Sequence, residues 1–552
     1  RLPEGRKEEL KYENDEYYAT DAFNDYAIEF LSQAQKKEEP FFLYLAHSSP
    51  HFPLEAPADT RDSYLKTYRK GWDKLRKERF AKQKQMGLVT DSWKFTKLSD
   101  VPVDRDDIAN QYAGKPNPNW KDIPQNRQED LVYRMATFAA MIDHVDQGIG
   151  KILSLLEKGE DLENTLILFT SDNGACYEWG PFGFDQSSRK GFTKLHEGKE
   201  LQNVGGPGTY HSVGSAWSCL SNTPLRMYKH FNHEGGNCSP LLVHWPKGII
   251  DTDRWIRSPV HLIDFMPTVL EVSEAHYPKK FKGEDLIPVE GKSLVPFFNG
   301  ARDAGDRVLC FDHFESSAIR KGDWKLVRGN NRYKNRTWEL YNLAEDRCET
   351  NNLIDSQAAK AEELEAEWLQ WAKRVKVSPY YSHVEENPAK VRKKLKKDAQ
   401  GFYILKHGDQ VAREYAPKFA QKSIEIKLSI TRGKEKSGVL ISHGGNHCGY
   451  SLYLVDGRPV FSCRLEGALH TIRATKILPK ERASLSAELL HDGRVFLKID
   501  GKVEGRGKLP GLFNSHPQDP LEIGNDSQST VVAYDSSSRF KGRLHEVKLK
   551  LK

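Results

Sequence analysis

The stretch TLILFTSDNGA, residues 165–175, decides how the first half of this chain folds. Residues 166–170 are apolar or β-branched, and an acidic turn follows at once. Such a run predicts a buried strand of a parallel α/β sheet. The turn would carry Asp172 and Asn173 at the carboxyl edge of that sheet, where open α/β folds bind ligands. A carboxylate beside an amide oxygen suits Ca²⁺ or Mg²⁺, although alone these residues are more typical of a plain turn.

Apolar strands and helices alternate on both sides of this stretch. Buried strands are expected at residues 41–46 (FFLYLA) and 240–245 (PLLVHW). Helical spacing of apolar residues predicts helices over residues 22–35, 65–79 and 128–158. The alternation of helices with wholly apolar strands indicates an α/β sheet whose strands run parallel.

The second half of the chain has a different texture. Short strands with turns follow Val308, and a helix is expected at Gln357–Val375. Further on, apolar and polar residues alternate, and Asp-Gly pairs at 456–457, 492–493 and 500–501 predict hairpins. We therefore expect an α/β domain at 1–300, a small antiparallel sheet at 301–382, a polar linker at 383–400 and an all-β sandwich at 401–552.

Composition narrows the functional classes. The 552 residues carry a net charge of +6, which mildly favours anionic substrates. No apolar run approaches the roughly 18 residues of a membrane span. No basic stripe interleaved with aromatic residues points to nucleic acid. The seven scattered cysteines include no CxxC pair, which disfavours zinc-ribbon and thioredoxin-type sites. The chain opens on Arg1 without a signal peptide, so a mature form or a fragment is expected.

Chemistry-bearing residues follow several of the expected strands. His51 lies just past residues 41–46, and Lys229 lies in a loop before residues 240–245. Singly, each has an ordinary explanation as a loop histidine or an exposed lysine. With Asp172 and Asn173, they would place an imidazole, an ammonium and two oxygen donors at one sheet edge. That set suits a tetrahedral oxyanion, because the cations offset its charge and the imidazole can protonate a leaving oxygen.

Eight segments, in order, resemble the type I sulfatases of the alkaline phosphatase superfamily, in the arylsulfatase A-like branch. They are FFLYLAHSSPHFPLEAP, YLKTYRKGWDKLRKERFAKQKQMGLV, NTLILFTSDNGA, SNTPLRMYKHFNHEGG, LLVHWPKGI, HLIDFMPTVLE, AIRKGDWKLV and WELYNLAEDRCETNNL. The resemblance spans roughly residues 17–377 and is far more specific than any single motif. It implies an alkaline-phosphatase-like mixed sheet flanked by helices, and a sulfuric ester hydrolase.

The resemblance also implies roles for single residues. Asp172 and Asn173 match two of the family's ligands to Ca²⁺. His51 matches the histidine near the leaving oxygen of the sulfate ester, and Lys229 matches the lysine that binds a sulfate oxygen. His313 falls near a position on the pocket rim, but its surroundings depart from the family pattern, and we leave it outside the core set. Export to the periplasm or the cell exterior is implied by the family alone.

One family feature is missing from this sequence. Sulfatases of this type carry Cys-x-Pro/Ala-x-Arg, whose Cys or a Ser in its place becomes the formylglycine nucleophile. None of the seven cysteines has those followers, and no serine version replaces them. The family's first metal-binding aspartates are also missing. We expect an N-terminally truncated sulfatase that has no turnover alone and binds Ca²⁺ weakly. The alternative is a degenerate protein that has lost catalysis.

Residues 401–552 resemble laminin G-like or concanavalin A-like modules. The segments that carry this likeness are SGVLISHGG, GYSLYLVDGRPVF, VFLKIDGK, PLEIGND and RFKGRLHEVKLKL. The resemblance implies a possible carbohydrate ligand, with a packing domain that binds nothing as the alternative.

The expected substrate is a sulfated small molecule or polysaccharide. Two other functions stay open. One is a carbohydrate-binding protein with a relic sulfatase domain, and the other is a phosphodiester or phosphonate hydrolase of the same superfamily. The arylsulfatase-like order of the motifs, especially YKHFNHEGG, favours sulfate over phosphate.

Overall fold

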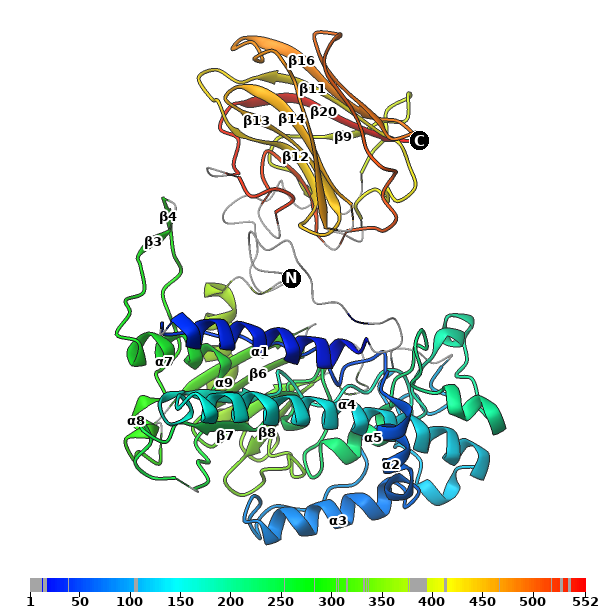
Figure 1. Ribbon diagram of the computed structural model, residues 1–552, viewed down its shortest axis with the longest axis vertical. Helices are drawn as coiled ribbons and strands as arrows, with labels where there is room; N and C mark the ends of the chain where they lie inside the picture. The colour runs from blue at the N-terminus through cyan, green and yellow to red at the C-terminus, as the bar shows by residue number, and fades with distance from the viewer. Residues whose placement is uncertain are drawn as a thin grey trace. The chain divides into compact units, whose positions relative to one another are not determined.

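A computed structural model of the chain describes Tyr12 and residues 17–552, apart from short gaps (Figure 1). The gaps are residues 38, 104–107, 253, 282, 304, 306, 314–315, 331–332, 334, 336, 376, 378–394, 412–414, 466, 518, 527–529 and 535–537. Most of the expected linker, 383–400, therefore lies outside the described residues. Within the described part of the chain, no helix combines the length and the apolarity that crossing a bilayer requires.

The chain divides into two compact units. One comprises Arg1–His276 with Val289–Tyr381, and the other comprises Tyr277–Pro288 with Ser382–Lys552. The domain boundaries expected from the sequence stay predictions.

Long helices cover one side of the first unit. α1 (Ala19–Lys37) lies beside α4 (Gln125–Lys158), and α2 (Ala58–Tyr68) also packs on α4 (Figure 1). The helix expected over residues 65–79 is in fact two, because the chain turns between α2 and α3 (Trp72–Gln85). Gly71 has φ +76° there, a left-handed conformation that ends one helix and leads into the next.

The prediction of a buried parallel strand at residues 166–170 is wrong in two respects. β1 (Ile167–Thr170) pairs antiparallel with β2 (Leu241–His244). Both strands are partly exposed, with Phe169 at 46% and Leu242 at 60% of full exposure. The physical reason is that β1 and β2 form a sheet of only two strands among the described residues, and such a pair buries neither face.

The strand expected at residues 41–46 is also wrong. These residues form no strand, and Phe42 and Tyr44 are 77% and 83% exposed. In the described part of the chain, this apolar run pairs with no strand and forms no isolated β-bridge.

A four-stranded antiparallel sheet completes the first unit and confirms the small sheet expected from the sequence. Its order is β5 (Val308–His313), β6 (Ser316–Lys321), β7 (Trp324–Arg328) and β8 (Trp338–Asn342). The expected helix is α9 (Ala358–Arg374), whose Leu364 and Trp368 are fully buried against this sheet. The remaining short helices are α5 (Ser215–Ser221), α6 (Glu234–Asn237), α7 (Phe265–Val272) and α8 (Val295–Phe298).

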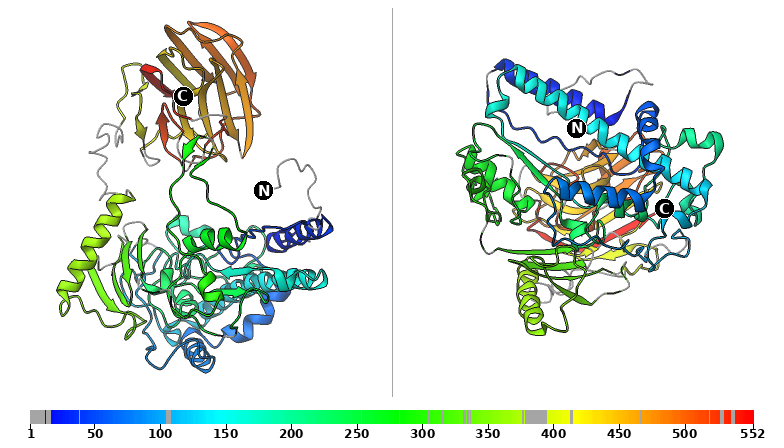
Figure 2. Two further views of the ribbon diagram at one scale, coloured as in Figure 1. Left: turned by 90° about the vertical axis from the view of Figure 1, so that its left-hand side faces the viewer. Right: turned by 90° about the horizontal axis from the view of Figure 1, so that it is seen from below.

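The second unit is mainly the expected sandwich of two antiparallel sheets (Figure 2). The first, here the β13 sheet, has the order β10 (Gln410–Val411), β19 (Leu521–Ile523), β12 (Gly438–Gly444), β13 (Gly449–Val455), β14 (Arg458–Leu465) and β15 (Ala468–Arg473). The second, here the β11 sheet, has the order β18 (Lys502–Lys508), β17 (Arg494–Ile499), β16 (Arg482–Leu489), β11 (Ile424–Thr431), β20 (Arg543–Leu551) and β9 (Tyr403–Leu405). A separate short hairpin joins β3 (Lys280–Phe281) to β4 (Glu284–Asp285).

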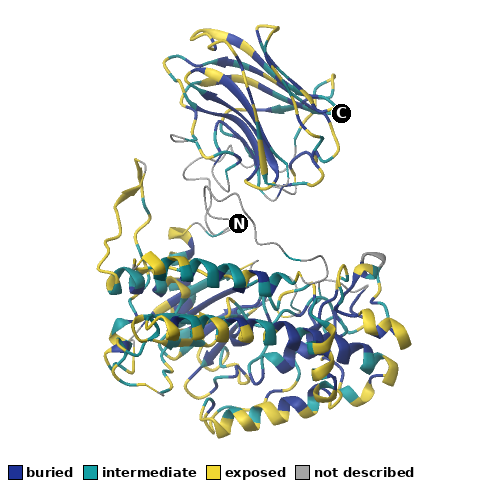
Figure 3. Ribbon diagram, viewed as in Figure 1, coloured by how far each residue is buried: buried dark blue, intermediate teal, exposed yellow. Residues whose placement is uncertain are grey.

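The sandwich has the two-residue periodicity that its sequence predicts. On β11, Ile424, Ile426, Leu428 and Ile430 are buried, and the residues between them are not (Figure 3). All three Asp-Gly pairs lie in turns between adjacent strands, β13–β14, β16–β17 and β17–β18. Asp456 and Asp500 have positive φ, as tight hairpin turns require.

Candidate active site

His51 and Lys229 are in direct contact. The Nζ atom of Lys229 lies 3.0 Å from Nε2 of His51. Nδ1 of His51 lies 2.8 Å from the carbonyl oxygen of Phe52, which can only accept a hydrogen bond. The ring therefore carries its proton on Nδ1, and Nε2 accepts from the ammonium of Lys229. The sequence prediction that these two residues meet agrees with this geometry.

The loop that carries Lys229 is folded against the turn after β1. The backbone N–H of Lys229 donates to the carbonyl of Ala175 at 3.0 Å, and Gly174 donates to Gly236 at 2.9 Å. A Cβ atom on Gly235 would lie 2.2 Å from the carbonyl oxygen of Arg226. Only glycine allows these backbones to approach so closely, which explains the Glu-Gly-Gly sequence here.

Asp172 and Asn173 lie on the turn that this loop contacts. Asp172 is exposed and Asn173 is half-buried, and neither side chain has a hydrogen-bond or ion-pair partner in the described part of the chain. Both residues line one cavity of about 4200 Å³ together with His51 and Lys229. That cavity is several times larger than an ordinary ligand pocket of roughly 300–1,000 Å³. The cavity alone therefore does not place these four residues next to one another. The backbone hydrogen bond between Lys229 and Ala175 does bring the Lys229 loop against the turn that carries Asp172 and Asn173.

A polar chain runs on from Lys229 through its neighbour His230. One ring nitrogen of His230 contacts Glu178 at 3.0 Å, and the other contacts Nε2 of His313 at 3.0 Å. The two imidazole rings are stacked with centroids 5.2 Å apart. Cys176 donates to the second oxygen of Glu178. His313, which the sequence analysis left outside the core set, therefore contacts the Lys229 loop directly through His230.

The hydrogen bonds among Cys176, Glu178 and His230 favour the ionised form of Glu178. Burial would raise the pKa of Glu178, but the hydrogen bonds from His230 and Cys176 lower it below the ordinary value. Burial and the neighbouring Glu178 carboxylate together raise the pKa of Cys176. Cys176 is thus held as a thiol, and it is a poor nucleophile.

The backbone on both sides of Lys229 is strained. Met227 and His230 have φ of +66° and +76°, in a region that residues other than glycine rarely adopt. Such conformations persist only where the surroundings enforce them, and they concentrate at functional sites.

Buried charges clamp this loop to the four-stranded sheet. Nζ of Lys325 lies 2.6 Å from Glu234 and 2.9 Å from Glu349, and the Lys325 side chain is 1% exposed. Arg347 forms a further ion pair with Glu234. The N–H of Glu234 donates to Glu349 at 2.8 Å. The carboxylate of Glu234, five residues after Lys229, is therefore held by two cations from the small sheet and its following turn.

A second clamp uses Glu339 of β8. Nε2 of His233 lies 3.3 Å from Glu339, and Tyr341 donates to the same carboxylate oxygen. Burial opposes ionisation of Glu339, but the bonds from His233 and Tyr341 lower its pKa to about 2.

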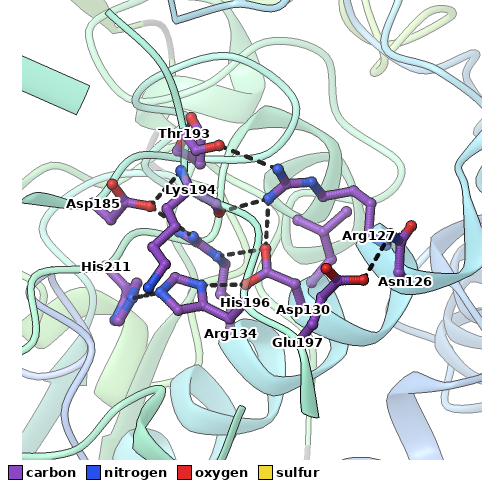
Figure 4. A network of polar contacts seen from close by, with 12 residues as sticks. Asn126, Arg127, Asp130, Arg134, Asp185, Thr193, Lys194, His196, Glu197 and His211 are labelled. Carbon is purple, nitrogen blue, oxygen red and sulfur yellow. Dashed lines mark hydrogen bonds and ion pairs between the residues drawn. The ribbon is translucent and has the colours of Figure 1, made fainter. Parts of the chain in front are cut away.

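The loop segment 183–214 is tied to α4 by a buried network of charges (Figure 4). Asp130 lies 2.7 Å from Nδ1 of His196, 2.8 Å from Arg127 and 3.3 Å from Arg134. His211 contacts His196, and its carbonyl accepts from the N–H of Leu54, three residues after His51. The network therefore supports the segment that carries His51.

Aromatic rings also border His51. Phe52 packs edge-on against Phe184 at 4.7 Å, and Phe184 lies 5.5 Å from Tyr210 and 5.0 Å from Trp179. Tyr210 is 43% exposed. The His51–Lys229 pair thus has aromatic neighbours through Phe52 and polar neighbours through His230 and His313.

The described residues fit a calcium site only in part. Asp172 and Asn173 have suitable oxygen donors, but Ca²⁺ takes about six to eight oxygen ligands. Among the described residues, no group of three or more His, Cys, Asp or Glu side chains is arranged to hold a metal. We therefore derive no chemical step through a metal ion.

Several residues of this site escaped the sequence analysis. Glu178, His230, Lys325, Glu339 and Glu349 were given no role there. Lys325 lies in AIRKGDWKLV, one of the segments that carry the family resemblance. A lysine among the apolar residues of this strand was the one sign in the sequence that it could be buried in an ion pair. The pairing partners come from distant segments, which a single sequence does not reveal.

Comparison with known proteins gives two family matches. Residues 3–275 match the family described as "Sulfatase", and residues 226–374 match "N-sulphoglucosamine sulphohydrolase, C-terminal". Together the two matches cover residues 3–374 and do not include the β-sandwich.

Curated relatives agree with these matches. An uncharacterized sulfatase of Schizosaccharomyces pombe is 30% identical over 64% of this chain and 61% of its own length. An arylsulfatase of Klebsiella aerogenes is 28% identical over 51% of this chain and 56% of its own. An N-acetylglucosamine-6-O-sulfatase of Bacteroides thetaiotaomicron is 24% identical over 63% of this chain and 60% of its own. The chain thus spans little more than half the length of each of these relatives.

Proposed function

We propose that this chain, which belongs to the sulfatase family, supplies the sulfate-binding side of a sulfuric ester hydrolase whose substrate is a sulfated carbohydrate. The family membership rests on the two family matches over residues 3–374. The contact between Lys229 and His51 carries the assignment of the site, because it joins an anion-binding ammonium to a proton-carrying imidazole.

In this proposal, Lys229 binds a nonbridging oxygen of the sulfate ester and stabilises the charge that develops there. An arriving oxyanion competes with His51 for the ammonium protons. The His51 ring, with Nε2 released, then lies beside the leaving oxygen and can exchange a proton with it. The clamps on Glu234 and Glu339 hold the Lys229 loop in this position before substrate arrives.

Asp172 and Asn173 are proposed as two ligands of a Ca²⁺ ion, which would supply further positive charge to the sulfate group when bound. The formylglycine nucleophile that the family uses has no counterpart among the seven cysteines of this sequence. The carbohydrate is proposed because one relative carries N-acetylglucosamine-6-O-sulfatase as its name. Export from the cytoplasm is proposed on the family likeness alone.

Binding of radiolabelled inorganic sulfate, measured by equilibrium dialysis on the full chain, tests the site. Lys229→Gln should weaken binding by about tenfold or more, since a charged hydrogen bond contributes roughly 1.5–3 kcal/mol. Lys247→Gln removes an exposed lysine elsewhere in the same unit and should leave binding unchanged. Equal sulfate binding by wild type and Lys229→Gln would refute the assignment.

The phosphohydrolase alternative is tested in the same assay. Inorganic phosphate should compete no better than sulfate if the site is built for a sulfate ester. Phosphate that binds much more tightly, with the same dependence on Lys229, would favour the phosphodiester or phosphonate hydrolase instead.

A further inference from the structure

Positive charge is concentrated in the sandwich. Residues 401–552 contain 25 Lys and Arg residues against 16 Asp and Glu, a net charge of +9. The whole chain has a net charge of +6, so the other 400 residues are slightly acidic. A local excess of this size needs an explanation that the proposed active site in the other unit does not provide.

Much of this charge lies on the outer face of the β11 sheet. The alternation that buries Ile426 and Leu428 of β11 turns Lys427 and Ser429 outward, and the same alternation holds on the neighbouring strands (Figure 3). The outward cations are Lys427, Arg482, Arg494, Lys498, Arg506, Lys508, Arg543, Lys548, Lys550 and Lys552. The outward carboxylates of the described strands are Glu425, Glu488 and Glu546, with Asp398, Asp492 and Asp500 at the edges. We call this surface the basic face.

Like charges oppose each other across the basic face. Lys427 of β11 is paired directly with Lys548 of β20, and Arg494 with Lys508. Thr431 lies between Arg482 and Arg543 on the two neighbouring strands. Like charges directly opposite in a sheet are destabilising, so this arrangement costs folding stability.

The carboxylates on the face are already engaged. Glu425 bridges Lys427 and Lys552, each at 2.8 Å. Glu488 pairs with Lys498 at 2.6 Å, and Glu546 pairs with Lys548 at 2.9 Å. A second group of cations has no ion-pair partner among the described residues: Arg482, Arg506, Lys508, Arg543 and Lys550. These cations are available to an anion from outside.

The geometry of the basic face suits a linear, repeatedly charged ligand. Neighbouring strands lie about 4.8 Å apart, and outward residues recur about every 6.8 Å along a strand. Ser429, Ser484 and Ser486 lie between the cations and can donate or accept hydrogen bonds. Each exposed cation binds a single ion weakly, because water and salt screen it, so useful affinity requires many charges on one molecule.

We propose that the basic face binds a sulfated polysaccharide. The choice of a sulfated polysaccharide over other polyanions rests on the proposed function. The protein would then bind its substrate both at the proposed active site and at the basic face. Nucleic acid fits less well, because ring stacking needs exposed aromatic residues. The aromatic rings here are Phe496, half-buried, and Phe402, whose ring lies under Lys427 and Lys550.

The test is binding of dextran sulfate to the full chain by isothermal titration calorimetry, with neutral dextran as the uncharged comparison. Arg506→Gln, Lys508→Gln and Lys550→Gln together should weaken binding by at least tenfold and reduce its salt dependence. The matched control removes three exposed lysines elsewhere in the sandwich, by Lys434→Gln, Lys436→Gln and Lys480→Gln. It loses the same net charge and should change affinity by less than threefold.

Three results would overturn the proposal. They are unchanged binding by the basic-face variant, an equal loss in the control, and tighter binding of single-stranded DNA than of dextran sulfate. Because Lys508 lies directly opposite Arg494, and the three replaced cations have no ion-pair partner among the described residues, the basic-face variant should unfold at the same or a higher temperature than wild type. The basic-face variant should leave the binding of inorganic sulfate, and its dependence on Lys229, unchanged, so failure of the proposed active site would be recognised separately.

Discussion

Lys229 and His51 are 178 residues apart in the chain, yet Nζ of one lies 3.0 Å from Nε2 of the other. Lys229 is fixed by its backbone bond to Ala175, and His51 is fixed by the bond of its Nδ1 to Phe52. The two side chains therefore meet because two loops are held independently, and variants that loosen either loop should weaken anion binding without touching the pair itself.

Gly235→Ala should disrupt the Lys229 loop. A Cβ atom at this position would lie 2.2 Å from the Arg226 carbonyl and 2.5 Å from that of Met227, both backbone atoms. We expect a loss of about 1–3 kcal/mol in unfolding free energy and weaker sulfate binding. Gly150→Ala is the matched control, because nothing lies within 4 Å of its Cβ on an exposed turn of α4. It should stabilise the chain by about 0.5–1 kcal/mol, and urea unfolding distinguishes the two.

Lys325→Met should be strongly destabilising. It leaves Glu349 buried without its cation and removes one of the two cations that hold Glu234. Removing one partner of a buried ion pair costs about 3–5 kcal/mol, which urea unfolding should show. Adding Glu349→Gln should recover part of the loss, because the uncompensated charge is then gone.

Lys321→Met serves as the comparison for that variant. Its ion pairs with Glu363 and Glu367 are solvent-exposed, so its effect on unfolding should be small. Equal effects of Lys325→Met and Lys321→Met would show that burial of the Lys325 cluster does not matter to stability.

Stability should fall in mild acid because of His211. Burial, followed by the nearby Arg134 and His196, lowers the pKa of His211 to about 3, while Asp130 opposes the shift. The unfolded chain, with an ordinary histidine pKa near ~6.5, then binds more protons than the folded chain between these values. Unfolding free energy should therefore decrease as pH falls below about 6.5, by about 2–3 kcal/mol at pH 4.5 from this residue.

His211→Asn isolates that contribution. Urea unfolding of the variant between pH 7 and 4.5 should show a shallower pH dependence than wild type, whereas His276→Asn, at an exposed position, should not. Parallel pH profiles for wild type and His211→Asn would contradict the assignment.

The sequence predicted the elements whose signals are local. α4 and α9 follow their apolar stripes, and the three Asp-Gly turns form as expected, because periodicity and turn chemistry act over a few residues. The meeting of His51 with Lys229 could also be predicted, since each follows or precedes an apolar run of the same family pattern.

The predictions that were wrong concern features that depend on contacts between segments far apart in the sequence. The run at residues 41–46 has strand-forming residues, but a strand also needs a partner, and the described residues provide none. The direction of β1 against β2 is likewise a matter of pairing, which apolar runs alone do not encode. The clamps through Lys325 and Glu339 were missed for the same reason, since their partners lie far away in sequence.

Calcium binding and turnover provide the last prediction. Asp172 and Asn173 supply two of the roughly six to eight oxygens that Ca²⁺ requires, so calorimetry on the full chain should give a dissociation constant of roughly 1 mM or weaker. Asp172→Ala should abolish even that binding, and Asp91→Ala, at an exposed residue of the same unit, should not. Hydrolysis of p-nitrophenyl sulfate should be undetectable, because no cysteine here lies in the formylglycine pattern and Cys176 is held as a thiol by burial and Glu178. Turnover that disappears in Lys229→Gln would show instead that the chain contains a nucleophile of its own.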